Sequence, residues 1–233
     1  MSARTFCALR SARRDATAVA LALVACASMP TATAAAPGGW GSLGVLGGST
    51  LPDGQLARYQ WDTHARAAWG AQGLVGTGRY ALGVRMWRSQ TVQVLDLPGG
   101  PLSPAVRSTT FEVLGRVRLH SVAGADLGVT GSAGRIRLAY RPDRVVVSSG
   151  PGGDVVADLA PVSDWTAATG IFAERLLPGH WQLGLSLDRR VFALDTAHRS
   201  GPSVIDAHER FGDWSTRVEL AWRLPLSVKG SSR

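Results

Sequence analysis

The feature that most constrains this chain is a strict alternation of residue character between Trp214 and Leu224. In the order W-S-T-R-V-E-L-A-W-R-L, every second residue is apolar or weakly polar, and Arg217, Glu219 and Arg223 stand between them. Because successive side chains of a β-strand point to opposite faces, this pattern predicts a strand with one apolar and one charged face. Such a strand either packs its apolar face on a protein core or turns that face to lipid in a membrane barrel.

The same alternation recurs from Trp40 onward and is interrupted by turn-forming residues. Eight segments carry it, at about residues 40–48, 59–71, 79–88, 109–121, 127–140, 165–177, 181–188 and 214–224. The connections after the second, fourth and sixth segments are short. The other four are long, and they cover residues 49–57, 95–108, 141–164 and 196–212.

An even number of strands joined by connections that alternate in length is typical of outer-membrane barrels. The sequence therefore predicts an all-β fold, an eight-stranded antiparallel up-and-down transmembrane β-barrel with short periplasmic turns and long external loops. An eight-stranded barrel is just wide enough to be filled by side chains, so we expect opposite charges to pair inside and plug the lumen. The residues expected to face the interior are Asp62, His64, Arg66, Arg85, Glu112, Arg116, Arg118, His120, Glu174, Asp188, Arg217, Glu219 and Arg223.

Three places leave the strand register open. Arg88 would point outward if the parity of its strand continued, so either the lipid zone ends near Trp87 or a bulge resets the phase. The apolar parity also reverses at Gly134-Arg135, and a glycine at a phase change suggests a β-bulge. The register near Arg189 is likewise undecided.

Aromatic residues stand near both ends of the predicted strands. Indole and phenol groups favour the membrane interface, because the ring prefers lipid while the N–H or O–H prefers water. The expected aromatic girdle consists of Trp69, Tyr80, Trp181 and Trp222 beside the short turns, with Tyr59, Trp61, Trp165 and Trp214 beside the long loops. A soluble barrel would instead place the apolar faces inside; the girdle and the loop lengths favour the membrane barrel.

The first 34 residues are predicted to be a cleaved export signal. Four arginines precede an apolar run over 16–28, and Ala32-Thr33-Ala34 forms an A-x-A cleavage site. The apolar run is shorter than the roughly 20 residues of a spanning helix. The expected organisation is a signal peptide at 1–34, a barrel at 35–226 and a short tail at 227–233.

An alternative for the N-terminus is lipidation at Cys26, because Leu23-Val24-Ala25-Cys26 resembles a bacterial lipobox. The other cysteine, Cys7, also lies in the export segment. A barrel that starts at Ala35 would therefore have neither a disulfide framework nor thiolate chemistry.

Together these features resemble the small eight-stranded outer-membrane proteins of Gram-negative bacteria, such as the OmpA barrel, OmpX and OmpW. The likeness covers about residues 40–224 and is architectural. The last strand also resembles the C-terminal assembly signal of such proteins, which implies the outer-membrane assembly machinery as a partner. Two departures stand out: Glu219 occupies a place where that signal favours glycine, and the chain continues to Arg233 instead of ending in an aromatic residue.

Candidate catalytic residues lie in the last long loop, where His198, Ser200, Asp206, His208 and Glu209 would supply a base, a nucleophile and an acid. The His-x-Ser pair is similar to that of outer-membrane lipid A deacylases, although the rest of their motif is absent. The alternative, which the sequence favours, is an ordinary polar loop.

No cofactor or metal is expected. His64 and His120 lack the clustered spacing of metal ligands, and Gly76-Thr77-Gly78 does not open a helix after a strand, as a nucleotide-binding loop would. The net charge of +8 is carried almost wholly by arginine. Export and the scattered placement of these arginines argue against a nucleic-acid partner.

We therefore expect a monomeric outer-membrane barrel with a structural, adhesive or interaction role through its external loops. Arg88, Arg107, Arg199 and Arg210 near the external rim are expected to pair with lipopolysaccharide phosphates, which suit the planar guanidinium. Two alternatives stay open. One is a lipid A-modifying enzyme in the same barrel, and the other is a periplasmic or lipid-anchored barrel that binds an apolar ligand.

Overall fold

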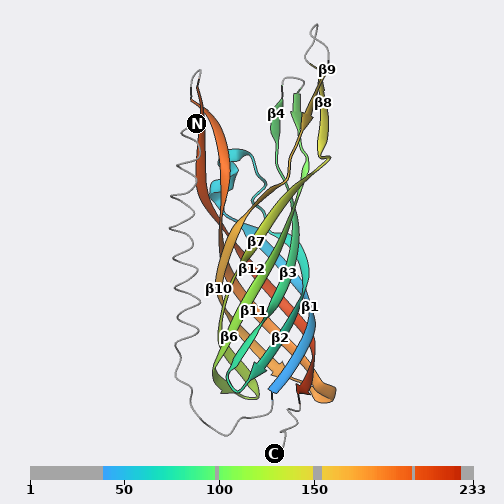
Figure 1. Ribbon diagram of the computed structural model, residues 1–233, viewed down its shortest axis with the longest axis vertical. Helices are drawn as coiled ribbons and strands as arrows, with labels where there is room; N and C mark the ends of the chain where they lie inside the picture. Colours follow the sequence, from blue (N-terminus) through green and yellow to red (C-terminus); the bar gives the residue numbers. More distant parts are fainter. Residues whose placement is uncertain (1–38, 98–99, 149–153, 201–202, 227–233) are drawn as a thin grey trace, which may run out of the picture. The chain divides into compact units, whose positions relative to one another are not determined.

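The alternating segments fold into a closed antiparallel ring in a computed structural model that describes residues 39–97, 100–148, 154–200 and 203–226 (Figure 1). Eight strands form the ring in the order β1-β12-β11-β10-β7-β6-β3-β2. Their bounds are β1 (Gly39–Pro52), β2 (Arg66–Thr77), β3 (Tyr80–Val92), β6 (Ala105–Val122), β7 (Ala125–Arg141), β10 (Val162–Leu176), β11 (Trp181–Ser200) and β12 (Ser203–Leu226). Each pairs with the next ring strand in sequence, and β1 closes the ring on β12, so the topology is up-and-down.

The two ends of the barrel differ in how the strands are joined. At one end, here called the turn end, β2–β3, β6–β7 and β10–β11 are joined by tight turns, the last through the short helix η3 (Pro178–His180). Gly124, with φ of 80°, occupies the left-handed conformation that such a turn requires. The first residue of β1, Gly39, pairs with Leu226 at this same end.

The opposite end, here called the loop end, carries the longer connections. They contain the 3₁₀ helix η1 (Gly54–Tyr59), the hairpin of β4 (Leu95–Leu97) with β5 (Gly100–Leu102), and the hairpin of β8 (Arg144–Ser148) with β9 (Asp154–Asp158). No helix among the described residues is long and apolar enough to cross a membrane.

The expected loop over 196–212 is wrong. β11 and β12 instead run on as a paired hairpin, from Trp181 opposite Trp222 to Ser200 opposite Ser203. At the base of this hairpin the alternation continues, with the apolar residues Phe192, Leu194 and Phe211 buried. The alternation is harder to recognise here because the apolar residues now face the interior and the polar ones face outward.

This exchange of faces divides the barrel into two zones. In the zone nearer the turn end the outward residues are aliphatic, with Leu43 and Val84 exposed at 73% and 62%. The buried residues of that zone include charged ones. Near the loop end the buried residues are apolar, and they form the cluster of Leu56, Val106, Ile136, Leu138, Phe192, Leu194 and Phe211, called the apolar cap below. The first zone contradicts a soluble barrel with an apolar interior, because its aliphatic residues lie outside.

The exchange also explains the reversal at Gly134-Arg135. Pairing of β7 with both neighbours is continuous there, so no bulge is present and that expectation is wrong. Thr130 and Ile136 both point inward, while Arg135 is exposed because the strand has left the apolar band. Pairing is also continuous at Arg88 and Arg189. The register shift of the barrel instead lies in β6, between Arg118 and His120.

Three outward tryptophans mark the loop-side boundary of the apolar band, and each has an arginine directly across the strand pair. The pairs are Trp69 with Arg88, Trp165 with Arg135 and Trp214 with Arg189, with guanidinium carbons 5.6, 5.4 and 5.4 Å from the ring centroids. The placement of Trp69 beside the short turns is therefore wrong, because β2 begins only at Arg66 and Trp69 lies near its loop end.

The turn-side boundary carries Tyr80, Trp181 and Trp222, which are outward and partly exposed. The rings of Trp181 and Trp222 lie 5.4 Å apart. Trp214 and Trp222 are separated by about 26 Å along β12, or about 20 Å along the barrel axis at a tilt of about 40°. That separation fits the apolar band of about 25 Å in membrane barrels.

Candidate functional site

The middle of the barrel is filled by a network of buried ions centred on Glu112 of β6. Arg85 Nε donates to Glu112 Oε2 at 2.8 Å, and Arg190 Nε lies 3.2 Å from Glu112 Oε1. Arg190 also reaches Asp213 Oδ2 at 3.3 Å. These residues come from four strands, so the network links β3, β6, β11 and β12 across the lumen.

A second contact set joins this network from β12. Arg217 is paired with Asp188, which also lies 3.8 Å from Arg85 Nη1. The guanidinium of Arg217 lies over the buried ring of Trp87 at 5.3 Å. Each arginine in the middle of the lumen therefore has an acidic partner, as buried charges require.

Closer to the turn end, Arg116 of β6 is the centre of the next layer. Its guanidinium lies 3.3 Å from Glu174 Oε2 and 2.9 Å from Glu219 Oε2, and it donates to Gln72 Oε1 at 3.3 Å. Gln182 Nε2 donates to Glu174 at 2.7 Å. Side chains of three other strands, β2, β10 and β12, thus converge on one guanidinium, and β11 joins them through Gln182.

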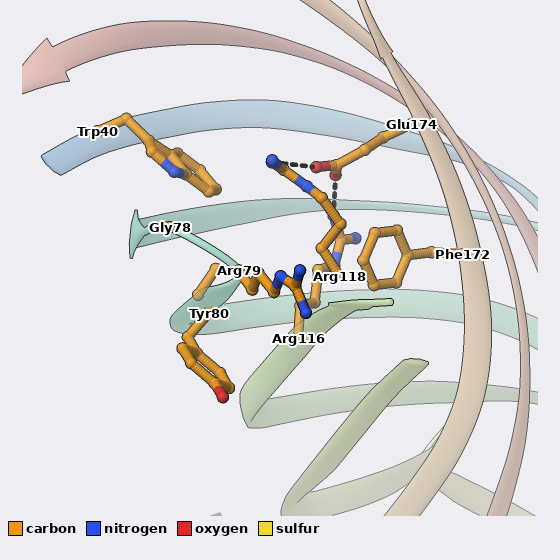
Figure 2. A pocket seen from close by; sticks show the side chains of 9 residues that line it. Trp40, Gly78, Arg79, Tyr80, Arg116, Arg118, Phe172 and Glu174 are labelled. Atoms are coloured by element: carbon orange, nitrogen blue, oxygen red, sulfur yellow. Dashed lines mark hydrogen bonds and ion pairs between the residues drawn. The ribbon is translucent and has the colours of Figure 1, made fainter. Parts of the chain in front are cut away.

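The turn-end mouth is narrowed by a third set of contacts around Glu174 (Figure 2). Figure 2 shows Glu174 in contact with the guanidinium groups of Arg116 and Arg118. Arg118 also pairs with Asp126 at 2.9 Å. The hollow left at this mouth has a volume of about 10 Å³, room for about one water molecule.

Trp40 covers the same mouth from the start of β1. The guanidinium of Arg223 lies over its ring at 3.9 Å. A β-carbon at Gly76 would stand 2.4 Å from Trp40 Cζ2, so only glycine allows the indole to lie there. The turn end is therefore closed by a stacked cation and ring as well as by ion pairs.

The interior of the loop end is lined mainly by the apolar cap. Helix η1 places Leu56 in this cluster, and Tyr59 and Trp61 pack against it. The rings of Tyr59 and Phe211 meet edge to face at 5.8 Å. The hollow beneath this cover has a volume of about 40 Å³, and its lining includes Thr50, Trp61 and Asp213. The expectation that Tyr59 and Trp61 belong to the girdle is wrong, since both contact the apolar cap.

Between the ionic layers and the apolar cap, Trp87 Nε1 donates to Thr50 Oγ1 at 3.1 Å, with both side chains buried. Thr50→Val keeps the shape but leaves the indole N–H without an acceptor, and we expect it to lower the free energy of unfolding by about 1–3 kcal/mol. Urea unfolding in detergent micelles measures this loss. Thr50→Ser retains the hydroxyl and serves as the control; equal stability of the two variants would contradict the role of the hydrogen bond.

Most of the residues expected inside do lie there. Those that are buried are Arg85, Glu112, Arg116, Glu174, Asp188, Arg217 and Glu219. Arg118 and Arg223 are half-buried at the turn end, where their strands reach the mouth.

Three placements differ from the expectation, and a fourth residue, Arg66, lies at the loop-end rim of the interior. Asp62 and His64 lie in the connection before β2, and the His64 side chain is 89% exposed with its Nδ1 2.6 Å from Asp62 Oδ1. Arg66, at the first position of β2, is paired with the same Asp62 and is also partly exposed. His120 is exposed because the register shift after Arg118 ends the alternation of β6. Asp62, His64 and His120 thus lie away from the interior ion pairs, whereas Arg66 keeps the inward parity of Ala68 and lines the hollow at the loop end.

Several interior residues escaped the sequence reading: Gln72, Trp87, Gln182, Arg190 and Asp213. Arg190 and Asp213 lay just beyond the ends assigned to their strands. Both follow from the period of two, because side chains of equal parity share a face of the strand. Arg190 is two residues after Asp188 on β11, and Asp213 is four residues before Arg217 on β12.

The candidate catalytic residues lie along the β11–β12 hairpin. The side chains of His198, Ser200 and Asp206 fall outside the described part of the structure. Ser200 pairs with Ser203 and His208 with Asp195, so about 17 Å of strand separates Ser200 from His208.

His208 itself has other partners. Its Nδ1 lies 2.7 Å from Asp195 Oδ1 and its Nε2 3.8 Å from Asp164 Oδ2. Glu209 is half-buried opposite Leu194. Within the residues that the structure covers, no group of three metal-ligating side chains is placed to hold an ion.

Comparison with known proteins gives likeness in fold alone. No protein-family model matches the chain, and no curated protein sequence matches it. Among solved structures, Neisserial surface protein A has 6% identity over 81% of this chain and 99% of its own, with a TM-score of 0.47. Ail of Yersinia pestis has 13% identity over 79% and 99%, with a TM-score of 0.37. The outer membrane protein AlkL has 11% identity over 86% and 97%, with a TM-score of 0.40.

The structure itself settles the class of the protein. Its strands form a closed ring, aliphatic side chains cover the outside between two aromatic boundaries, and paired ions fill the inside. Closed barrels satisfy all backbone hydrogen bonds within lipid, which open sheets do not. The chain is a small eight-stranded β-barrel of the outer-membrane type.

Proposed function

We propose that this barrel is a sealed scaffold in the outer membrane that acts through the structures at its loop end. The observation that carries the proposal is the set of buried ion pairs in the barrel interior. Paired ions occupy the membrane-spanning zone, and the apolar cap lines the loop end. A channel would require a continuous water path, and the hollows described at the loop end and the turn end hold about 40 and 10 Å³.

Charge balance within the lumen supports a structural plug. Five carboxylates and four arginines are buried there, and Arg118 at the turn end adds one more guanidinium. A permeating ion would have to break buried ion pairs, and breaking such a pair costs free energy because it leaves a charge unpaired in the interior. The plug therefore ties strands together instead of selecting a solute.

The β8–β9 hairpin supports an interaction role. Val146 and Val156 lie directly opposite each other and are 62% and 53% exposed, although the hairpin projects beyond the apolar band (Figure 1). Exposed aliphatic residues on a water-facing hairpin favour contact with another surface. An exposed pair of Arg144 with Asp158 at 2.8 Å holds the base of this hairpin.

Two measurements test the proposal. In planar bilayers the purified barrel is expected to show no stepwise conductance, whereas a porin under the same conditions conducts; regular steps from the wild type would overturn the sealed lumen. In an adhesion assay, cells that express the wild type should bind a test surface better than cells with empty vector.

The double variant Val146→Ser/Val156→Ser should lose that added adhesion while still migrating as a folded barrel on an unboiled detergent gel. The matched control is Val84→Ser/Val113→Ser, which removes two outward valines of similar exposure from the membrane band. Loss of adhesion in the control but not in the hairpin variant would contradict the role of β8–β9.

A further inference from the structure

Five arginines gather on the outer wall of β3, β6 and β7, just beyond the loop-side tryptophans. This set, called the arginine face below, consists of Arg88, Arg107, Arg135, Arg137 and Arg141. Each occupies an outward position, because the alternate residues on these strands are the inward ones. Among the described residues, none of the five has a carboxylate within ion-pair distance.

The register brings these side chains close together. Thr109 of β6 lies between Arg88 of β3 and Arg137 of β7, directly opposite both. Arg107 lies one outward step along β6, and Arg141 is opposite Ala105, one step further. Outward neighbours on adjacent strands are about 5 Å apart when opposite and about 7–8 Å apart on the diagonal. The face is therefore continuous.

The closeness of these charges affects the pKa of Arg107, which lies beyond the membrane band. The pKa of its guanidinium is lowered from the ordinary value by desolvation and then by the positive charges of Arg141 and Arg88. Like charges held this close, with no acid beside them, favour an anion from outside the chain.

Two other exposed arginines of the loop end differ from this face, because each has an acidic partner. Arg189 lies 3.6 Å from Asp53. Arg144 is paired with Asp158. The charges of Arg189 and Arg144 are thus balanced within the chain, whereas those of the arginine face are not.

The position of the face relative to lipid identifies the kind of anion. Arg88 stacks on Trp69 and Arg135 on Trp165, so two guanidiniums stand at the height where indole rings mark the membrane boundary. Directly below, toward the turn end, Val84, Phe111 and Val113 present an aliphatic and aromatic wall exposed at about 60%. A ligand that spans both regions carries phosphate above and acyl chains below.

We propose that the arginine face binds the phosphate groups of lipid A in the outer leaflet, while the acyl chains lie along the wall of β3 and β6. Guanidinium groups bind phosphate with two parallel hydrogen bonds, which gives geometric specificity as well as charge. Arg88 and Arg107 belong to the rim set expected from sequence; the side chain of Arg199 lies outside the described residues, and Arg210 lies on β12, away from this face. The inference rests on the barrel standing in an outer membrane and is independent of any partner at the β8–β9 hairpin.

The test is binding of purified lipid A to the folded full-length barrel in detergent, followed by native mass spectrometry or fluorescence. Arg88→Gln/Arg107→Gln/Arg137→Gln is expected to weaken binding of diphosphoryl lipid A about tenfold or more. The matched control, Arg58→Gln/Arg79→Gln/Arg175→Gln, removes the same charge from exposed arginines outside the face and should stay within about twofold of the wild type. The charge-preserving variant Arg88→Lys/Arg107→Lys/Arg137→Lys should bind lipid A with an affinity between those two. Lysine keeps the positive charge but lacks the planar guanidinium that binds phosphate with two hydrogen bonds.

A second comparison uses only the wild type, so it does not depend on how the variants fold. Dephosphorylated lipid A with the same acyl chains should bind the wild type about tenfold or more weakly than diphosphoryl lipid A does. Equal binding of the two lipids would overturn the phosphate contact. Displacement of lipid A by an equimolar amount of inorganic phosphate would overturn its assignment to lipid, because the acyl chains would then contribute nothing.

Discussion

Glu112→Gln is expected to lower the free energy of unfolding of the barrel by about 3–5 kcal/mol. The side chain keeps its size but loses the charge that Arg85 and Arg190 contact at 2.8 and 3.2 Å. Both guanidiniums are buried, so neither gains water when the carboxylate is removed. The cost is that of leaving buried cations without an anion, which exceeds the net contribution of an intact pair.

Reversible urea unfolding in lipid or detergent, followed by tryptophan fluorescence, measures this loss. Asp158→Asn is the control, since it removes an acid from an exposed pair with Arg144 and should cost about 0–1 kcal/mol. The double variant Glu112→Gln/Arg190→Gln removes one charge of each sign and should be less destabilised than the two single variants combined. If Glu112→Gln costs no more than Asp158→Asn, water screens the lumen and the plug is weaker than its geometry indicates.

Val84→Arg is expected to destabilise the barrel by about 2–4 kcal/mol, although Val84 contacts little of the protein. Its side chain is 62% exposed and lies between Tyr80 at the turn-side boundary and Arg88 at the loop-side boundary. The surroundings of this residue are therefore hydrocarbon, in which a guanidinium loses its hydration.

Val146→Arg is the matched comparison, because Val146 is also a strand valine with 62% exposure. It lies on the β8–β9 hairpin, where the surroundings are water, and the same change should cost no more than about 0.5 kcal/mol. Unfolding of both variants in lipid vesicles provides the measurement. Equal costs would place the two valines in the same medium and would contradict the membrane boundary drawn at the Trp69–Arg88 level.

Within the apolar band, the alternation in the sequence predicts correctly which side chains face the interior. Glu112, Arg116, Arg217 and Glu219 are buried because local alternation determines which side chains share a face. The alternation changes phase where the apolar band ends. At Gly134-Arg135 the change of phase suggested a bulge, yet the pairing there is regular and only the surroundings of the strand change.

The sequence by itself determined that the chain forms eight ring strands, which residues share a face of each, and which connections are tight. Only the tertiary structure decided the height at which each strand crosses the membrane boundary. That height placed Trp69 on the loop side, extended β11 and β12 through the expected loop, and moved Asp62 and His64 out of the lumen. The reason is physical: alternation is a property of one strand, whereas height follows from the stagger of all eight strands when the ring closes.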